Sequence, residues 1–169
     1  MNSLNQSFVN LSSDIQYFFI KQIVKHKYNN KDLNEEEMIH TCQIKINEND
    51  IENFHSKKIL DNSDFIQILQ LFNEIFIDIK YPSKSYNSVL DSLSKIKKVS
   101  NNKIKIFVYI KGINEVPSLF DPDNIVNTVI IESPATIIEE KTFYSLSSIE
   151  RITISAPIKT IGSFSFSEC

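Results

Sequence analysis

Apolar and polar residues alternate in three stretches of the chain, which is the period of a β-strand with one buried face. The stretches are residues 75–79, 104–110 and 151–155. Pro157 follows the last of them and has no N–H to donate, so we expect that strand to end there. The pattern predicts that the three strands belong to one sheet.

Helical spacing replaces this alternation in the N-terminal part. Apolar residues three and four positions apart predict helices at residues 12–27, 64–73 and 86–99, and the acidic run at 34–37 predicts the start of a further short helix. Ser12 or Ser13 can cap the first helix, and Asp14 suits its first turn. We therefore interpret residues 1–102 as a mainly helical cap region.

A 23-residue period relates the last two segments of the chain. Apolar or proline residues recur at this offset without a gap: Val126 and Ile149, Val129 and Ile152, Ile131 and Ile154, Pro134 and Pro157, Ile138 and Ile161, Phe143 and Phe166, and Leu146 and Cys169. One such coil cannot bury its own apolar edge and needs a neighbour on each side. The period predicts repeats at residues 124–146 and 147–169, with Phe143, Phe166 and Cys169 directed inward.

The second repeat has the pattern I-x-I-x-x-x-I-x-x-I-G-x-x-x-F-x-x-C from Ile152 to Cys169, which resembles the BspA-like leucine-rich repeats. The first repeat keeps the frame, with Glu139 for the glycine and Leu146 for the cysteine. The resemblance covers residues 124–169, about a quarter of the chain. It implies an α/β fold in which a helical cap precedes a short leucine-rich-repeat solenoid, and a non-enzymatic scaffold that binds a protein partner.

Residues 103–123 are expected to form a degenerate first repeat of the same solenoid. At the 23-residue offset Ile106 falls under Val129, whereas Glu115 takes the place of Ile138. The predicted solenoid therefore spans residues 103–169.

The N-terminal run LSSDIQYFFI, residues 11–20, resembles the opening of an F-box, with a leucine, a small turn and a helix. F-boxes often precede leucine-rich repeats, so this resemblance implies a substrate adaptor of a ubiquitin ligase. A plain cap that shields the first repeat from water explains the same residues. The scaffold is the leading hypothesis and the adaptor is the alternative.

Composition and charge argue against several classes of function. Only Gly112 and Gly162 are present, so a glycine-rich phosphate loop cannot form. The net charge of −3 gives no basic field for a nucleic-acid backbone. The N-terminus lacks the basic region of a secretory signal, and no apolar run approaches the roughly 20 residues of a membrane helix. We expect no nucleic-acid partner, no membrane span and a cytoplasmic location, with the cell surface as the alternative that the family resemblance implies.

Candidate catalytic and metal-binding residues are few. His26, His40 and His55 have no further ligand at helical spacing, whereas a zinc site needs about four ligands. Cys42 and Cys169 form no CxxC pair, and nothing orients His40 as a base for Cys42. We therefore expect no catalytic residue, no metal and no cofactor.

Outward residues of the predicted sheet form a candidate partner-binding surface. Its members are Lys105, Phe107, Tyr109, Ile130, Glu132, Arg151 and Thr153. Phe107, Ile130 and Thr153 are expected to form an apolar stripe between the aromatic and charged members, a composition typical of an interface. Cover by the cap or by a neighbouring chain is the alternative for this face.

The second repeat ends at Cys169, where the frame would turn into another coil. Ile161, Phe164 and Phe166 are then expected at an open end of the stack, and an unpaired strand edge there favours association with other chains. We expect either that the sequence is a fragment of a longer repeat protein or that it self-associates end to end through the C-terminal repeat.

Overall fold

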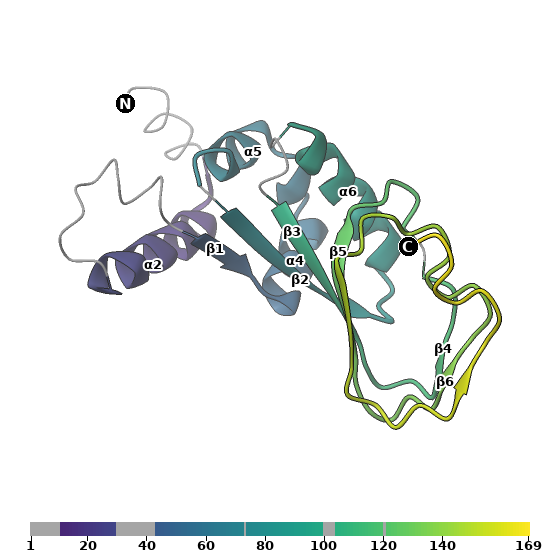
Figure 1. The fold of residues 1–169 in the computed structure, drawn as a ribbon. Helices are drawn as coiled ribbons and strands as arrows, with labels where there is room; N and C mark the ends of the chain where they lie inside the picture. The colour runs from purple at the N-terminus through teal and green to yellow at the C-terminus, as the bar shows by residue number, and fades with distance from the viewer. Residues whose placement is uncertain (1–10, 30–42, 73, 100–103, 120) are drawn as a thin grey trace.

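Five parallel strands form the main sheet of the protein (Figure 1). The computed structural model describes residues 11–29, 43–72, 74–99, 104–119 and 121–169. In spatial order the strands are β1 (Gln43–Ile46), β2 (Glu74–Tyr81), β3 (Ile104–Ile110), β5 (Val126–Ile131) and β7 (Arg151–Ile154). Every neighbouring pair is parallel, so all strands start at the same end of the sheet and the chain returns to that end before each of them. The α/β class and the shared sheet of the three predicted strands are confirmed.

Four α-helices accompany the sheet in the described part of the chain. They are α2 (Ser13–Asn29), α4 (Glu48–Ser56), α5 (Ser63–Leu69) and α6 (Tyr86–Val99), with a 3-10 turn η1 (Ile59–Asp61) between α4 and α5. Asn47 and Asn62 cap α4 and α5, because each side-chain oxygen accepts two backbone N–H groups of the first turn at 2.9–3.0 Å.

The predicted helices at 12–27, 64–73 and 86–99 are confirmed, although the second ends earlier, at Leu69. The expected helix start at 34–37 lies outside the described residues. β1 and α4 are not among the predicted elements, because each buries only two apolar side chains and so has a weak periodic signal. The region expected to be mainly helical therefore also supplies two strands of the sheet, β1 and β2.

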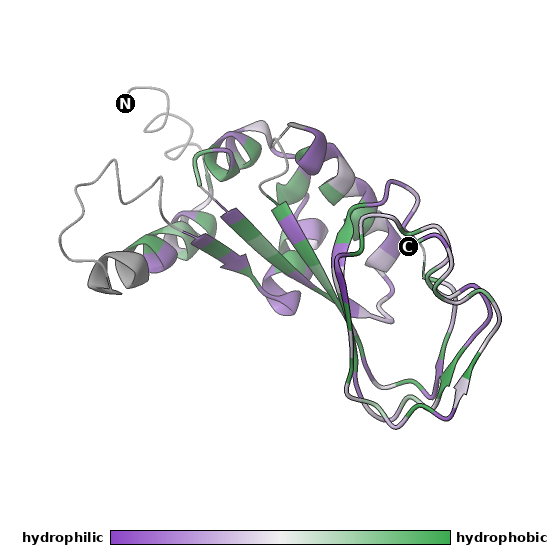
Figure 2. Ribbon diagram, in the orientation of Figure 1, coloured by the Kyte–Doolittle hydropathy of each residue, from purple (hydrophilic) through white to green (hydrophobic). Residues whose placement is uncertain are grey.

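In the part of the chain that the structure describes, helices cover only one face of the sheet, and the other is called the uncovered face. Figure 1 shows α4, α5 and α6 behind the strands, with no described helix across the front. The covered face is apolar: in β3 the side chains of Ile104, Ile106, Val108 and Ile110 are fully buried, whereas the residues between them are partly exposed. Figure 2 shows the same alternation as changes of colour along the strands. Since parallel sheets are usually covered on both faces, the uncovered face is the unusual feature of this fold.

Phenylalanine rings hold α2 against the helical layer. The Phe19 ring stacks on the Phe72 ring with 5.7 Å between their centroids, and the Phe65 ring lies 5.8 Å from the Phe19 ring. Phe18 meets Phe54 edge-on at 5.3 Å. Rings in these arrangements add to the free energy gained by burial alone, so α2 belongs to the same hydrophobic core as α4 and α5.

From β3 onward the chain leaves each strand of the main sheet, passes through a second parallel ladder opposite it, and returns (Figure 1). Each such turn of the chain is called a coil, and the last coil comprises residues 147–169. The strands of the second ladder are β4 (Glu115–Val116), β6 (Ile137–Ile138) and β8 (Thr160–Ile161). Thr128 pairs with Arg151 in the main sheet, and Ile137 pairs with Thr160 in the second ladder. Both pairs are 23 residues apart, so the strand register follows the period of the sequence.

The 23-residue offset also separates special backbone positions and buried hydroxyl groups. Positive φ angles occur at Lys141 and Phe164 (58° and 57°) and at Ser145 and Glu168 (58° and 62°). Thr142 and Ser165 are both buried, and their hydroxyls donate to the carbonyls of Glu139 and Gly162 at 2.7 and 2.6 Å. The recurrence is therefore not limited to the apolar pattern.

The expected alignment of residues 103–123 is wrong by two positions in the main sheet and by one position in the second ladder. Val129 pairs with Val108, which makes the offset between β3 and β5 at this point 21 residues rather than 23. In the second ladder the offset is 22, which places Val116 beside Ile138. Val116 is fully buried, so this coil keeps an apolar residue where the expected frame placed Glu115.

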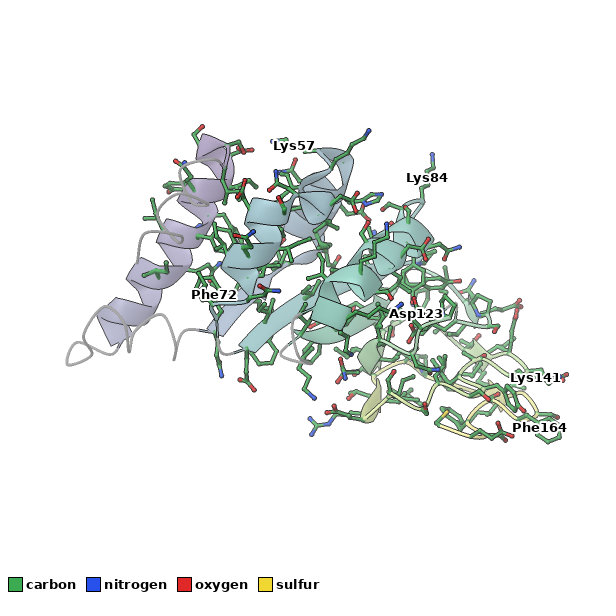
Figure 3. The ribbon with its side chains drawn as sticks, turned by 90° about the horizontal axis from the view of Figure 1, so that it is seen from above. Lys57, Phe72, Lys84, Asp123, Lys141 and Phe164 are labelled. Atoms are coloured by element: carbon green, nitrogen blue, oxygen red, sulfur yellow. The ribbon has the colours of Figure 1, made fainter. Side chains whose placement is uncertain are left out.

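The last coil exposes apolar side chains on its outer side. The exposed fractions are 42% for Ile154, 56% for Ile161, 62% for Phe164 and 39% for Phe166. Figure 3 shows Phe164 at the end of the coils farthest from α2. Of the three side chains expected to be directed inward, Phe143 is fully buried. Phe166 and Cys169 are exposed, so the expected burial is wrong for both, because no further coil covers them among the described residues. Both still contact Phe143: the Phe166 ring lies 5.4 Å from the Phe143 ring, and the Cys169 thiol donates to the Phe143 carbonyl at 2.8 Å.

Candidate functional site

The uncovered face of the sheet carries the candidate binding residues in cross-strand rows. One row consists of Asp78, Phe107, Thr128 and Arg151, and the next consists of Lys80, Tyr109, Ile130 and Thr153. Lys105 precedes the first row on β3, and Glu132 follows the end of β5. All seven predicted residues are therefore on or beside this face, and each is at least partly exposed.

The expected apolar stripe of Phe107, Ile130 and Thr153 is not a single row. Ile130 and Thr153 do pair, but their neighbour on β3 is Tyr109, whereas Phe107 lies beside Thr128. The cause is the two-residue difference in the β3–β5 register. As a result an aromatic side chain stands at the β3 position of both rows.

Phe76 of β2 is a member of this surface that the prediction omits. Its ring centroid lies 6.0 Å from that of Phe107, with the two rings tilted by 50°, and both side chains are partly exposed. The alternation at residues 75–79 already directs Phe76 and Asp78 away from the buried side. The two rings form an aromatic pair across adjacent strands.

Most lysines on and beside the face are paired with carboxylates. Lys45 contacts Asp78 at 3.0 Å, and this hydrogen bond raises the pKa of the lysine. Lys105 pairs with Glu150, and hydrogen bonding to Lys105 lowers the pKa of that carboxyl. The two charges within each pair cancel, so these residues give the face little net charge.

Tyr109 occupies the end of β3 beside another ion pair. Lys111 contacts Glu48 at 2.5 Å, and its Nζ lies 5.4 Å from the centroid of the Tyr109 ring. Burial, followed by the nearby Asp78 carboxylate, raises the pKa of the Tyr109 hydroxyl. Both effects favour the neutral form of the Tyr109 hydroxyl.

A groove of about 400 Å³ lies on the face, with the aromatic pair, Thr128, Glu150 and Arg151 among its lining residues. A hollow of similar size, about 420 Å³, lies beside the first turn of α2, next to Lys57 and Asp14. Those two residues pair with each other at 2.6 Å, so they have no free charge for a ligand. The groove on the sheet is the stronger candidate site because it combines apolar surface with Arg151.

A serine–histidine contact outside the sheet does not form a catalytic site. Ser88 Oγ lies 3.0 Å from His55 Nε2, but the same hydroxyl donates to the Ser85 carbonyl at 2.9 Å. Ser88 is exposed on α6, away from either hollow described above. His40 and Cys42, considered in the sequence, lie outside the described residues.

Among the described residues, no three or more histidine, cysteine, aspartate or glutamate side chains lie together in a group that could hold a metal ion. No helix in the same ranges is long and apolar enough to cross a bilayer. No protein-family model, curated protein or solved structure matches the chain.

Proposed function

We propose that this protein is a non-enzymatic interaction scaffold that binds a protein partner on the uncovered face of its sheet. The main support is that no described helix covers one face of the parallel sheet, and that Phe76, Phe107, Tyr109 and Arg151 lie on this face. Aromatic and arginine side chains are enriched at the centres of interfaces. A face of this composition on a rigid sheet favours binding over chemistry.

We further propose that residues 103–169 form a short BspA-like leucine-rich-repeat solenoid. Three observations support this: the 23-residue register in two ladders, the recurrence of positive φ angles, and the recurrence of buried hydroxyls. Gly162 fits the same interpretation, since a Cβ there would lie only 2.3 Å from the backbone nitrogen of Glu140 in the preceding coil. Close contact between coils is what a stacked repeat requires.

Affinity capture with a matched pair of baits tests the scaffold proposal. The wild-type chain and the double variant Phe107→Ala/Arg151→Ala are immobilised and exposed to a lysate of the source cells. We expect at least one protein to bind the wild type and not the variant. Identical sets of bound proteins on both baits would place the interface elsewhere.

End-to-end self-association is a second proposal, supported by the exposed Ile161 and Phe164 on the last coil. The edges of β7 and β8 lie on the same outer side, with no paired strand beyond them among the described residues. Unpaired edges flanked by apolar side chains favour pairing with another chain, and a second copy brings the same surface.

The ubiquitin-ligase adaptor remains the alternative function. Leu11, Ile15 and Phe19 of the F-box-like segment are buried in the core, which leaves Tyr17 and Ile20 as its exposed apolar residues. An adaptor would therefore have to bind through these two side chains. Capture of a ligase component by the wild type, and its loss with Tyr17→Ala/Ile20→Ala, would favour this alternative.

A further inference from the structure

The groove on the open face offers two different chemical surfaces to a ligand. On one side the rings of Phe76 and Phe107 provide a partly exposed apolar wall. On the other side Arg151, at the start of the edge strand β7, provides a guanidinium group beside Thr128. A ligand that fills the groove must therefore satisfy an apolar and a cationic surface at once.

Arg151 differs from the neighbouring lysines in its pairing. Lys45 and Lys105 are held by Asp78 and Glu150, whereas Arg151 has no carboxylate within ion-pair distance among the described residues. A guanidinium presents several donors in a planar arrangement that matches a carboxylate. The unpaired charge in the groove therefore selects for an acid.

We infer that the groove binds a segment of a partner protein in which an aspartate or glutamate lies next to an apolar side chain. This inference rests on the proposed scaffold function and specifies the partner's chemistry. The carboxylate pairs with Arg151, and the apolar side chain packs against Phe76 and Phe107. Charge complementarity of this kind determines which partners bind more than how tightly they bind.

Single-stranded nucleic acid is the competing ligand, since bases also stack on exposed aromatic rings. The charges of the groove argue against it. Glu150 lies in the groove wall, and Lys105 and Lys45 are engaged by carboxylates. Among the described groove residues, Arg151 is the one cation without a paired carboxylate. Binding of a phosphate backbone normally uses several unpaired cations.

Peptide selection with a charge-reversed variant tests the inference. A phage library of short random peptides is selected on the wild type, on Arg151→Glu, and on the control Lys159→Glu. Lys159 is exposed directly before β8 and forms no ion pair among the described residues, so its reversal changes the net charge equally without touching the groove. Fluorescein-labelled oligouridine is titrated into the same three proteins.

We expect the wild type and Lys159→Glu to select peptides with an acidic residue beside an apolar one. Arg151→Glu should select lysine or arginine at that place and bind the wild-type peptides about tenfold more weakly, which is the effect of about 1.4 kcal/mol. Selected peptides without acidic residues, or the same peptides on wild type and Arg151→Glu, would overturn the inference. If the peptides selected in either of these cases lost their binding in Phe107→Ala, the scaffold proposal would stand while the inference about an acidic ligand failed.

Two further outcomes also overturn the inference. Oligouridine binding that is lost in Arg151→Glu, with no peptide selected, would identify the face as a nucleic-acid site. Binding of neither probe would leave the groove without a ligand of the inferred chemistry, and the scaffold proposal would then depend on the protein captured from lysate.

Discussion

The side-chain oxygen of Asn127 accepts a hydrogen bond from the backbone N–H of Ile106 at 3.0 Å, where the pairing of β3 and β5 shifts register. The same oxygen lies 3.4 Å from Lys97 Nζ, and the amide nitrogen donates to Glu150 at 3.3 Å. A register shift leaves ladder groups unpaired, and an unpaired buried N–H is costly. The Asn127 side chain therefore replaces a missing ladder bond at the junction between the two parts of the sheet.

Replacing Asn127 by alanine is expected to lower the free energy of unfolding by about 1–3 kcal/mol, because the buried N–H of Ile106 loses its acceptor. Asn87→Ala is the matched control, since Asn87 is exposed on α6 and its loss should change stability by less than about 0.5 kcal/mol. Urea unfolding of both variants measures the difference. Equal stabilities would mean that water replaces the amide at Ile106.

Phe143→Ala is expected to destabilise the protein by about 3–5 kcal/mol, the usual cost of removing a buried phenylalanine ring. Phe143 is fully buried and lies 5.4 Å from the ring of Phe166. Phe164→Ala removes the same atoms from a side chain that is 62% exposed, so it should have little effect. Thermal melting distinguishes the two, and similar losses in both variants would contradict the burial pattern of the coils.

The pKa of Asp14 is expected at about 2, because hydrogen bonds from Lys57 and then Ser12 stabilise its carboxylate. A lowered folded pKa adds stability above the pH at which the unfolded carboxyl ionises, near 3.8, and this contribution disappears as the pH falls toward 2. A carbon-13 NMR titration of the carboxyl measures it directly.

In Lys57→Ala the pKa of Asp14 should move back toward 3.8. In Lys84→Ala, which removes a lysine far from α2 (Figure 3), it should not move. A normal pKa in the wild type would show that the pair between Lys57 and Asp14 does not form in solution.

Much of the fold could be predicted from periodicity, since β3 and α6 have the bounds that their apolar spacing predicts. The 23-residue period likewise predicts the pairing of Val129 with Ile152. The β3–β5 register could not be predicted this way, because a shorter connection and the Asn127 side chain change the offset locally. Non-local hydrogen bonds of this kind leave no periodic signal.

The candidate site could be predicted only in part, and for a similar reason. Alternation assigns Phe107 and Arg151 to the outward side, but which residues become neighbours depends on the register. The contact between Phe76 and Phe107 depends on β2 lying directly beside β3, and this strand order is set by tertiary packing.

If the last coil mediates self-association, the apparent mass of the protein should rise with concentration. Ile161→Ser/Phe164→Ser should remove this dependence, because it replaces the two most exposed apolar side chains of that end by polar ones. Tyr17→Ser/Ile20→Ser makes a comparable change on α2 and should leave the dependence unchanged. Multi-angle light scattering over a range of concentrations measures the mass. A wild type that stays monomeric at high micromolar concentration would rule out this proposal.

The most direct test of the account is the affinity of the captured partner for the open face. Calorimetric titration should give a Kd at least about tenfold weaker for Phe107→Ala/Arg151→Ala than for the wild type, a loss of about 1.4 kcal/mol, because both side chains lie at the groove. Tyr17→Ala/Lys84→Ala, which removes an exposed aromatic and a cation elsewhere, should keep the wild-type Kd. An unchanged Kd in the folded groove variant would contradict the proposal that the uncovered face of the sheet is the binding surface.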